Sequence, residues 1–292
     1  MGLTISFGFD CDYPRGIDFI RTQEGKTKLD STVKGLEFIR DNCNRLRIPR
    51  TYFICGQFLN SIIDSLGLVK GINLFEPNSN LVEIGNHTWD HQVIIPLKSR
   101  PDKVPMTKEQ RQVNIEKTNK LIEDSLGLEM IYGFRTPLGH PSGLHQYKEI
   151  LNELKSLGFV YISSWLRDKK GSINPKLVKS YKNLRQPFYY PNRLLEIPTH
   201  GWHDTAFTRN TKTKLFSIPP HTYFEIINYY KNLFFEAGKI SKTTQVFNLA
   251  LVLHPSEILT YARYDFFDYL FEFSKELTAK FVKYIDICRY AG

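Results

Sequence analysis

The sequence predicts an α/β fold, in which a parallel sheet curls into a distorted barrel of seven or eight strands that helices wrap. Three observations predict it. Short apolar runs alternate with longer amphipathic segments along the chain. The apolar runs are too continuous for strands with one face in water, which favours a parallel sheet covered by helices. Eight such runs suit a closed or nearly closed barrel.

The expected elements follow in chain order. Strands are predicted at LTISFGF (3–9), RTYFICG (50–56), LVEIG (81–85), EMIYGF (129–134), GFVYISS (158–164), LLEIP (194–198), VFNLALVL (246–253) and FVKYIDI (281–287). Between them, apolar residues recur every three or four positions, which predicts helices. These segments include 28–43, 107–127, 144–158, 221–238 and 267–277. In 144–158, for example, Ile150, Leu151, Leu154 and Leu157 share one helical face.

The length indicates one domain. A chain of 292 residues suits an undivided α/β barrel with a sizeable core, so we expect a single domain over residues 1–292. Apolar residues make up 41% and charged residues 24% of the chain, which excludes a mainly disordered protein. The segments 92–106 and 166–193 are rich in Pro and Lys. We interpret them as loop insertions at one end of the barrel.

The N-terminus and the cysteines predict a compartment. MGLTISFGFDCD enters a strand pattern without a basic segment or a cleavable apolar segment. No apolar stretch approaches the ~20 residues of a membrane span. The four cysteines are scattered without CxxC spacing, which argues against a disulfide framework or a zinc-finger cluster. We therefore expect a cytoplasmic protein with reduced thiols and no integral membrane segment.

The chain is basic, with 39 Lys and Arg against 30 Asp and Glu and a net charge of +9. Much of the excess lies in 167–185 and 208–214. A basic surface attracts anionic partners such as nucleic acid, phosphorylated glycans, sugar nucleotides or an anionic leaflet, although solvated Lys-rich loops are the favoured explanation of the charge. No Arg-rich helix, RNA-binding signature or helix-turn-helix pattern accompanies it, so we do not expect nucleic acid as a partner. The oligomeric state stays open.

Polar residues gather where predicted strands end, and in a parallel barrel these ends converge. Asp10 and Asp12 follow the first strand, and residues two apart in an extended segment point the same way. His87 and His91 follow the third strand, and both imidazoles can lean to one side if the chain turns helical there. Two imidazoles and one carboxylate form the ligand set of a catalytic zinc or similar divalent site. A structural alternative exists for each pair. The aspartates could form a turn, and the histidines could face solvent.

Two further polar residues stand at strand ends. Arg135 follows EMIYGF, and His254 ends NLALVL. His254 has a structural alternative as a capping or core histidine before Pro255.

Five segments together resemble the polysaccharide deacetylases of the carbohydrate-esterase type. They are FDCD (9–12), RTYFICGQFL (50–59), EIGNHTWDH (83–91), FRTPLG (134–139) and LALVLHP (249–255), and they span most of the chain. The single residue between the aspartates resembles the branch that includes peptidoglycan deacetylase-like and allantoinase-like members. The distorted barrel of that family agrees with the alternation above.

The resemblance implies a metal site. Asp12, His87 and His91 would bind one divalent ion, with Zn²⁺ expected and Co²⁺, Ni²⁺, Mn²⁺ or Fe²⁺ as alternatives. Such an ion lowers the pKa of bound water toward about 7.

The resemblance also implies acid–base roles. Asp10 would be the general base, Arg135 would orient it, and His254 would be the general acid that protonates the leaving nitrogen. An imidazole that titrates near ~6.5 suits that task. The backbone N–H of Tyr13 would help to stabilise the oxyanion.

Further residues are expected to contact substrate, because flat aromatic rings stack on the apolar face of a pyranose. The aromatic candidates are Tyr13, Trp89, Trp165 and Trp202. They are joined by Pro137 and by Asp204, which resembles the acidic groove residue of the family. Packing in the core or rim is the alternative for each aromatic residue.

Two features depart from the family pattern. Ile162 stands where members usually have an acid, so the expected partner of Arg135 is missing. Arg135 would then find another acid or sit closer to Asp10, which would make that base more acidic. His200 and His203 are additional histidines, interpreted as loop residues or substrate contacts.

These expectations add up to a metal-dependent hydrolase that removes an acyl group, mainly acetyl, from the nitrogen of an amino sugar. The sugar would be a precursor in surface polysaccharide, lipopolysaccharide or cell-wall biosynthesis, with or without a phosphate group, as the location and the basic charge suggest. A ring-opening amidohydrolase of the allantoinase or cyclic-imidase type is one alternative. A non-catalytic carbohydrate-binding relic is another.

Overall fold

The computed structural model describes residues 2–97, 100–141, 143–167, 185–208, 219–244 and 246–290. The strands are β1 (Leu3–Cys11), β2 (Arg50–Ile54), β3 (Val82–Asn86), β4 (Gly133–Pro141), β5 (Tyr161–Arg167), β6 (Phe188–Tyr189), β7 (Leu195–Glu196), β8 (Phe247–Leu253) and β9 (Lys280–Phe281). The helices are α1 (Ile17–Arg21), α2 (Gln23–Leu46), α3 (Gly56–Leu66), α4 (Leu68–Phe75), α5 (Lys108–Leu126), α6 (Lys148–Ser156), α7 (Thr205–Thr208), α8 (Tyr223–Ser241), α9 (Pro255–Tyr261), α10 (Phe266–Glu276) and α11 (Tyr284–Ile287).

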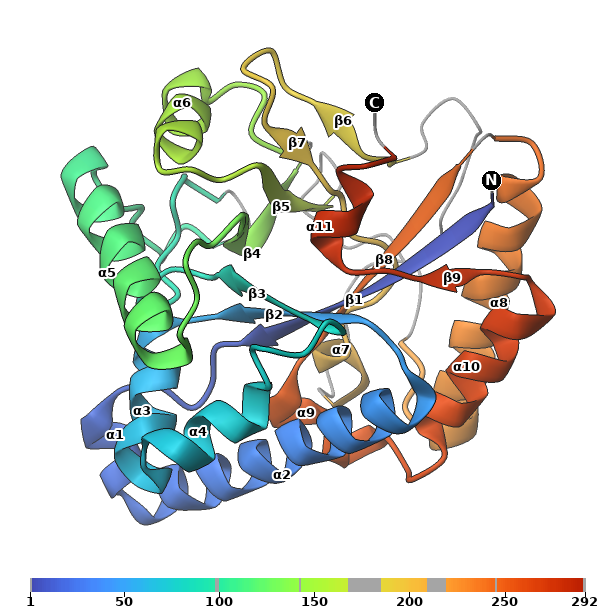
Figure 1. Cartoon of the computed structure of the whole chain (residues 1–292), viewed down its shortest axis with the longest axis horizontal. Coiled ribbons are helices and arrows are strands. Elements are labelled where there is room, and N and C mark those ends of the chain that lie inside the picture. The colour runs from blue at the N-terminus through green and yellow to red at the C-terminus, as the bar shows by residue number, and fades with distance from the viewer. Residues whose placement is uncertain are drawn as a thin grey trace.

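The strands form one curled sheet in the order β6-β7-β5-β4-β3-β2-β1-β8, and β9 pairs with the start of β1. Every pairing is parallel except that of β6 with β7. Helices α2, α8 and α10 cover one side of the sheet and α5 another (Figure 1). The α/β fold class predicted from the sequence, a distorted barrel wrapped by helices, is confirmed.

The barrel does not close by a backbone ladder between β7 and β8 within the described ranges. Side chains bridge this seam instead. The amide of Gln186 accepts from the backbone N–H of Asn248 at 2.7 Å and donates to its carbonyl at 3.1 Å. Likewise, the backbone N–H of His200 donates to the carbonyl of Ala250 at 2.8 Å, and its ring Nδ1 accepts from the Ala250 N–H at 3.2 Å. His200 is therefore a seam residue, and burial lowers its pKa to about 3.

The alternation of side chains along β1 decides what faces the barrel interior. Ile5, Phe7 and Phe9 belong to the large apolar core, and Phe7 contacts Phe267 of α10 edge to face at 5.9 Å. The intervening residues are small or polar. Gly8 lies directly against the guanidinium of Arg135, so the strand leaves room for a charged pair inside the barrel.

A second apolar cluster packs inside the barrel beside α11 (Figure 1). α11 contributes Tyr284 and Ile287 to this cluster. The buried carboxylate of Glu83 holds α11 in place, because it accepts from the backbone N–H of Ile285 at 2.9 Å. The prediction of a strand over 281–287 is wrong. Only its first residue belongs to β9, and a short helix follows because Asp286 accepts from the N–H of Lys283 at 3.2 Å.

Other boundaries also differ from the sequence predictions. β4 begins later than the predicted 129–134 and extends to Pro141, while α1, α3, α4, α7 and α9 were not predicted. β6 forms within 166–193, which was expected to be a loop, because it pairs with β7. The loop 92–106 contains neither helix nor strand in its described part. Residues 168–184 of the expected insertion and most of the basic stretches 167–185 and 208–214 lie outside the described residues.

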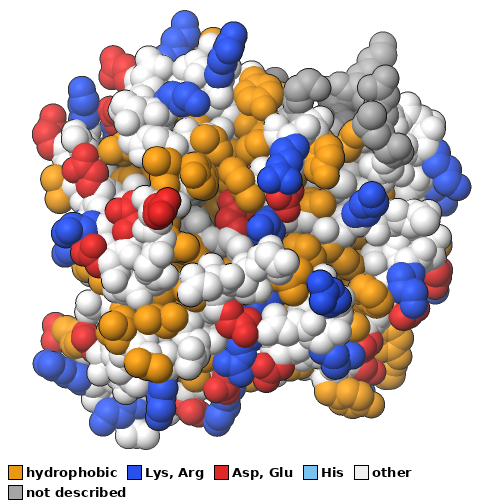
Figure 2. Space-filling view, viewed as in Figure 1, with side chains coloured by type: hydrophobic (Ala, Val, Ile, Leu, Met, Phe, Trp, Pro, Cys, Tyr) orange, Lys and Arg blue, Asp and Glu red, His pale blue; other side chains and the backbone are white. Residues whose placement is uncertain are grey.

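The described residues include no helix that is both long and apolar enough to cross a membrane. On the face shown in Figure 2, Lys and Arg side chains are scattered among Asp and Glu rather than gathered into one patch.

Candidate active site

Asp10 ends β1 inside the barrel and is 6% exposed. Its Oδ1 accepts from Nη1 of Arg135 at 2.7 Å, and its Oδ2 lies 3.8 Å from Nε2 of His87 and 4.0 Å from Nε2 of His254. Burial raises the pKa of Asp10, but the attraction of Arg135, His87 and His254 outweighs burial and holds the pKa well below its ordinary value. Asp10 is therefore an ionised carboxylate that faces two imidazoles.

Arg135 is placed by aromatic rings as well as by Asp10. Its guanidinium lies 3.9 Å from the ring centre of Phe53 and 4.9 Å from that of Tyr284, and it donates to Ser163 at 3.3 Å. Ile162, the position where the family usually has an acid, is fully buried and pairs with Phe134 in the sheet. Arg135 thus contacts Asp10 directly, which is one of the two arrangements expected from the sequence.

His254 follows β8 and is fixed by Asp204. The buried carboxylate of Asp204 accepts from Nδ1 of His254 at 2.6 Å and from its backbone N–H at 2.7 Å. Tyr261 donates to the same carboxylate at 3.1 Å. Burial lowers the pKa of His254, but Asp204, with help from Asp10 and Asp12, raises it overall to about 9. His254 is therefore a protonated imidazole at neutral pH, with its Nε2 toward Asp10.

Asp12 lies across from His91, with 3.5 Å between Oδ2 and Nε2. Two ligand atoms at about 2.0–2.1 Å from a tetrahedral Zn²⁺ lie about 3.3 Å apart, so this separation fits two ligands of one ion. Burial raises the pKa of Asp12, but His91, His254 and Arg15 outweigh it and lower the pKa. Burial lowers the pKa of His91 to about 3, so its imidazole is neutral.

His87 has the clearest sign of a ligand. Its Nδ1 lies 2.9 Å from the carbonyl oxygen of Arg135, so this nitrogen carries the proton and donates. Its Nε2 is buried and has no hydrogen-bond partner among the described residues. A histidine that donates one nitrogen to a backbone carbonyl and presents the other with a lone pair is arranged as metal-binding histidines are. Burial also lowers the pKa of His87.

A turn, rather than a helix, brings the two imidazoles together. Their ring centres are 4.8 Å apart, and Thr88 and His91 have positive φ angles of 67° and 61°. Asn114 of α5 holds this turn, because it accepts from the N–H of Trp89 at 2.6 Å and donates to Asp90 at 3.0 Å. The helical turn considered from the spacing is not formed. Nothing in the sequence pattern singles out Asn114.

These donors fit a divalent cation in chemistry and in one separation, the 3.5 Å between Oδ2 of Asp12 and Nε2 of His91. In the described part of the chain, however, no three His, Cys, Asp or Glu side chains are grouped closely enough to enclose a metal ion. Asp12 also accepts from Arg15, at 3.3 Å between Oδ2 and Nη1. The metal centre is accordingly a proposal, which is taken up below.

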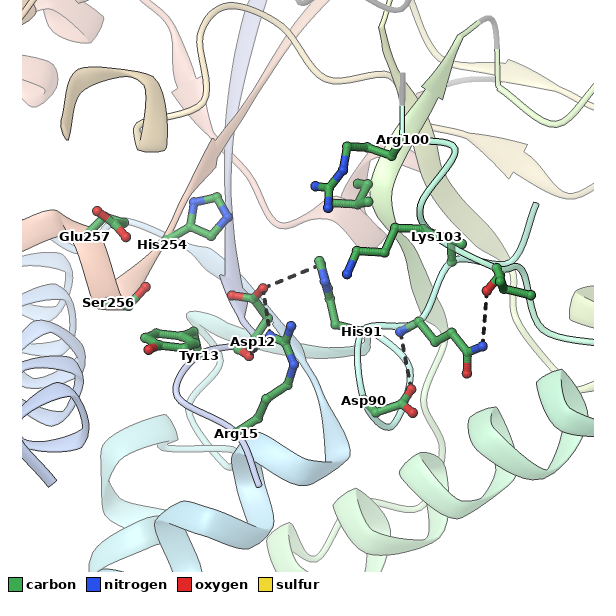
Figure 3. A pocket seen from close by; sticks show the side chains of 14 residues that line it. Asp12, Tyr13, Arg15, Asp90, His91, Arg100, Lys103, His254, Ser256 and Glu257 are labelled. Carbon is green, nitrogen blue, oxygen red and sulfur yellow. Dashed lines mark hydrogen bonds and ion pairs between the residues drawn. The ribbon is translucent and has the colours of Figure 1, made fainter. Parts of the chain in front are cut away.

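Asp12, His91 and His254 line a cavity of about 500 Å³, whereas Asp10 and His87 are not among its lining residues. Figure 3 shows Asp12 and His91 facing each other across it, with His254 beside Asp12. The remaining lining residues are Tyr13, Arg15, Asp90, Gln92, Val93, Arg100, Lys103, Val104, Leu138, Ser256 and Glu257. The loop 92–106 therefore forms one wall.

The expected substrate contacts are dispersed. Tyr13 lines the cavity. Trp89 packs against Gly56 and lies under Lys117, with 3.7 Å between Nζ and the ring centre. Trp202 is 8% exposed and belongs to the core.

The other expected contacts also lie apart from the cavity lining. Trp165 packs edge to face on Phe188 at 6.1 Å, and Pro137 is buried in β4. Asp204, expected along a substrate groove, lies behind His254, and this partnership spans 50 residues of sequence. The ring of His203 lies 5.8 Å from that of His254.

Part of the chain is similar to a known protein family. Residues 39–162 match the family model for polysaccharide deacetylase. No curated protein matches the chain by sequence.

Solved structures are similar in fold. One is a Mycobacterium smegmatis protein assigned to the polysaccharide deacetylases, with a TM-score of 0.67 and 14% identity over 99% of this chain and 90% of that one. Another is Puue allantoinase, with a TM-score of 0.64 and 16% identity over 99% and 89%. A third is a Pseudomonas aeruginosa PAO1 protein, also assigned to the polysaccharide deacetylases, with a TM-score of 0.64 and 14% identity over 99% and 90%. At these identities the structures show likeness of fold. The segment that matches the family model contains β3 and the two histidines that follow it, His87 and His91. Over residues 39–162 the chain is similar to the polysaccharide deacetylase family.

Proposed function

We propose that this protein is a metal-dependent deacetylase that hydrolyses the N-acetyl group of an amino sugar. The match of residues 39–162 to the polysaccharide deacetylase model supports deacetylase activity on carbohydrates, and with it a hydrolase that acts on amide bonds. The single observation that carries the assignment is the pair Asp10 and His254, whose carboxylate and imidazole face each other at 4.0 Å with pKa values moved in opposite directions. This arrangement supports an ionised carboxylate in the role of base and a protonated imidazole in the role of acid.

Asp12, His87 and His91 would hold the metal ion. A divalent cation bound there would supply Lewis-acid chemistry, which acidifies water and polarises a carbonyl. We propose Zn²⁺, with Co²⁺, Ni²⁺, Mn²⁺ or Fe²⁺ as alternatives. The neutral imidazoles and the ionised carboxylate are in the protonation states that binding requires.

The residues of the chain would then move the protons. Asp10, held in orientation by Arg135, is placed to accept a proton from the attacking water. His254 is placed to donate a proton to the nitrogen that leaves, and Asp204 keeps that proton on the ring at neutral pH. An amide nitrogen leaves poorly unless it is protonated, so this second transfer is as necessary as the first.

We further propose that the substrate is a cytoplasmic precursor in surface polysaccharide, lipopolysaccharide or cell-wall assembly. All four cysteines are free thiols, which suits a reducing compartment. The catalytic unit would be one domain, because β1 from the start of the chain pairs with β8 and β9 from its end.

The test compares acetate release from a sugar nucleotide, a lipid-linked sugar and a polymer side by side. Acetate release from the small precursors supports the proposal. Acetate release from the polymer alone would reject the proposal that the substrate is a precursor. Full activity in an Asp10→Asn variant would show that Asp10 is not the general base.

One observation favours a second candidate, a ring-opening amidohydrolase. The loop 92–106 lines the cavity, whereas Trp165 and Trp202 do not. A cavity bordered in this way suits a small cyclic amide, which exposes a similar carbonyl. Turnover of allantoin or a cyclic imide without acetate release from any sugar would select it. Turnover of neither class by the metal-loaded protein would favour a non-catalytic carbohydrate-binding relic.

A further inference from the structure

The wall of the cavity opposite His254 carries cationic side chains that the proposed reaction does not use. Arg100 and Lys103 extend from the loop 92–106 toward His91 and Asp12 (Figure 3). Arg15 adds a third cation, which is already paired with Asp12 at 3.3 Å. Amide hydrolysis by Asp10 and His254 needs none of these charges, so their convergence calls for another explanation.

The acidic side chains that share the cavity are occupied by donors of the chain. Asp90 accepts from Asn114 at 3.0 Å and from the N–H of Gln92 at 3.2 Å. Glu257 accepts from Thr208 at 2.8 Å. Arg100 is paired with Asp102 at 2.9 Å. Lys103, by contrast, has no carboxylate within ion-pair distance among the described residues.

The backbone that carries these cations is anchored. At the base of the loop, the N–H of Met106 donates to the carbonyl of Val93 at 3.0 Å, and both side chains are buried. At the tip, the N–H of Lys103 donates to the carbonyl of Arg100 at 3.0 Å. The buried base therefore holds the tip at the mouth of the cavity, where an ammonium group with three donors can meet a ligand.

We propose that Lys103, assisted by Arg100, binds an anionic substituent of the sugar, either a phosphate or a carboxylate. The inference rests on the proposed function, since it supplies the substrate class of the same cavity. An anion bound at this wall would set the orientation of the sugar, so that its acylated nitrogen faces His254. Lys103 is then a specificity-determining residue, and neutral sugars are poor ligands.

Binding measurements test this without turnover. Calorimetry on the metal-loaded protein compares N-acetylglucosamine, N-acetylglucosamine 1-phosphate and N-acetylmuramic acid, with Asp10→Asn as background to prevent hydrolysis. We expect at least one anionic sugar to bind about tenfold or more tightly than the neutral one, because charge-assisted hydrogen bonds are strong. Lys103→Gln should lose about tenfold of that preference, and Arg100→Gln should lose part of it. Salt should weaken the anionic ligand selectively.

Lys70→Gln is the matched control, because Lys70 is an exposed lysine of α4 outside the cavity lining. The ligand that shows the preference identifies the anion as phosphate or carboxylate. Equal affinity for neutral and anionic sugars, no measurable binding of either anion, or equal losses in Lys103→Gln and Lys70→Gln would overturn the proposal.

Failure of this inference and failure of the proposed function are distinguishable. If anionic sugars bind with the expected preference but the parent protein hydrolyses none of them, the deacetylase proposal fails while the anion site stands. If the neutral sugar is bound and deacetylated as well as the charged ones, the anion site fails while the deacetylase proposal stands.

Discussion

The carboxylate of Asp204 accepts two hydrogen bonds from His254, one from the ring at 2.6 Å and one from the backbone at 2.7 Å. The buried acid thereby fixes both the position of the imidazole and its protonation. The ring is turned so that Nε2 faces Asp10. This relationship couples the geometry of the proposed acid to its pKa.

Replacing Asp204 by Asn should shift the basic limb of the kcat/KM profile to lower pH. In the parent, the acid form of His254 persists up to its pKa of about 9. Without the carboxylate, burial remains and the pKa falls toward or below the ordinary ~6.5, so activity is lost as pH rises through neutrality. The kcat/KM measured from about pH 5 to about pH 10 checks this. Asp268→Asn, which removes an exposed partner of Arg45, should leave the profile in place. An unmoved limb in Asp204→Asn would contradict the assignment.

Gly8→Ala should reduce kcat on the order of 100-fold by displacing Arg135, since small misplacements of catalytic groups have effects of this size. A Cβ at Gly8 would lie 2.5 Å from Nη2 and 2.7 Å from Nη1 of Arg135. The guanidinium must move, and its pairing with Asp10 breaks. Steady-state kinetics and thermal unfolding separate this effect from general destabilisation. Gly2→Ala is the control, because nothing lies within 4 Å of its Cβ. Parental activity in Gly8→Ala would mean that the pairing is dispensable.

Chelation should abolish activity reversibly, and His87→Ala should prevent recovery. The unpartnered Nε2 of His87 is the nitrogen that we expect to bind the ion. Bound metal should also stabilise the native state, by about 2.7 kcal/mol at a hundredfold excess over Kd. Metal content and the melting temperature with and without Zn²⁺ measure both effects. His145→Ala serves as the control, since this exposed ring stacks on Phe188 at 4.9 Å. Full activity after complete removal of metal would refute metal dependence.

Asn114→Ala should weaken metal binding by about tenfold, within the range seen when groups that orient ligands are removed. The side chain of Asn114 forms hydrogen bonds with Trp89 and Asp90 in the turn between the two histidines. Without these bonds, we expect the two imidazoles to be held less firmly in position. Competition with a chromogenic chelator measures the affinity. Asn60→Ala provides the comparison, because the side-chain amide of Asn60 donates to Asp64 on its own helix, at 2.7 Å. Equal metal affinities in the two variants would show that the turn keeps its conformation without Asn114.

The sequence by itself determined the fold class and the positions of the polar strand ends. Apolar periodicity is local, so the alternation along β1 already directs Phe7 and Phe9 to the helices and Asp10 to the interior. Parallel strands end at a common edge, which is why Asp10, His87 and His254 could be expected to lie near one another.

Only the tertiary structure decided which groups became partners. Asp204 and His254 are 50 residues apart, and no local pattern links an acid after one loop to a histidine after another strand. The run 281–287 satisfies a strand pattern, yet burial of Tyr284 and Ile287 inside the barrel favours a helix. Contacts across a sheet depend on its curl and register, and the periodicity of a single segment predicts neither.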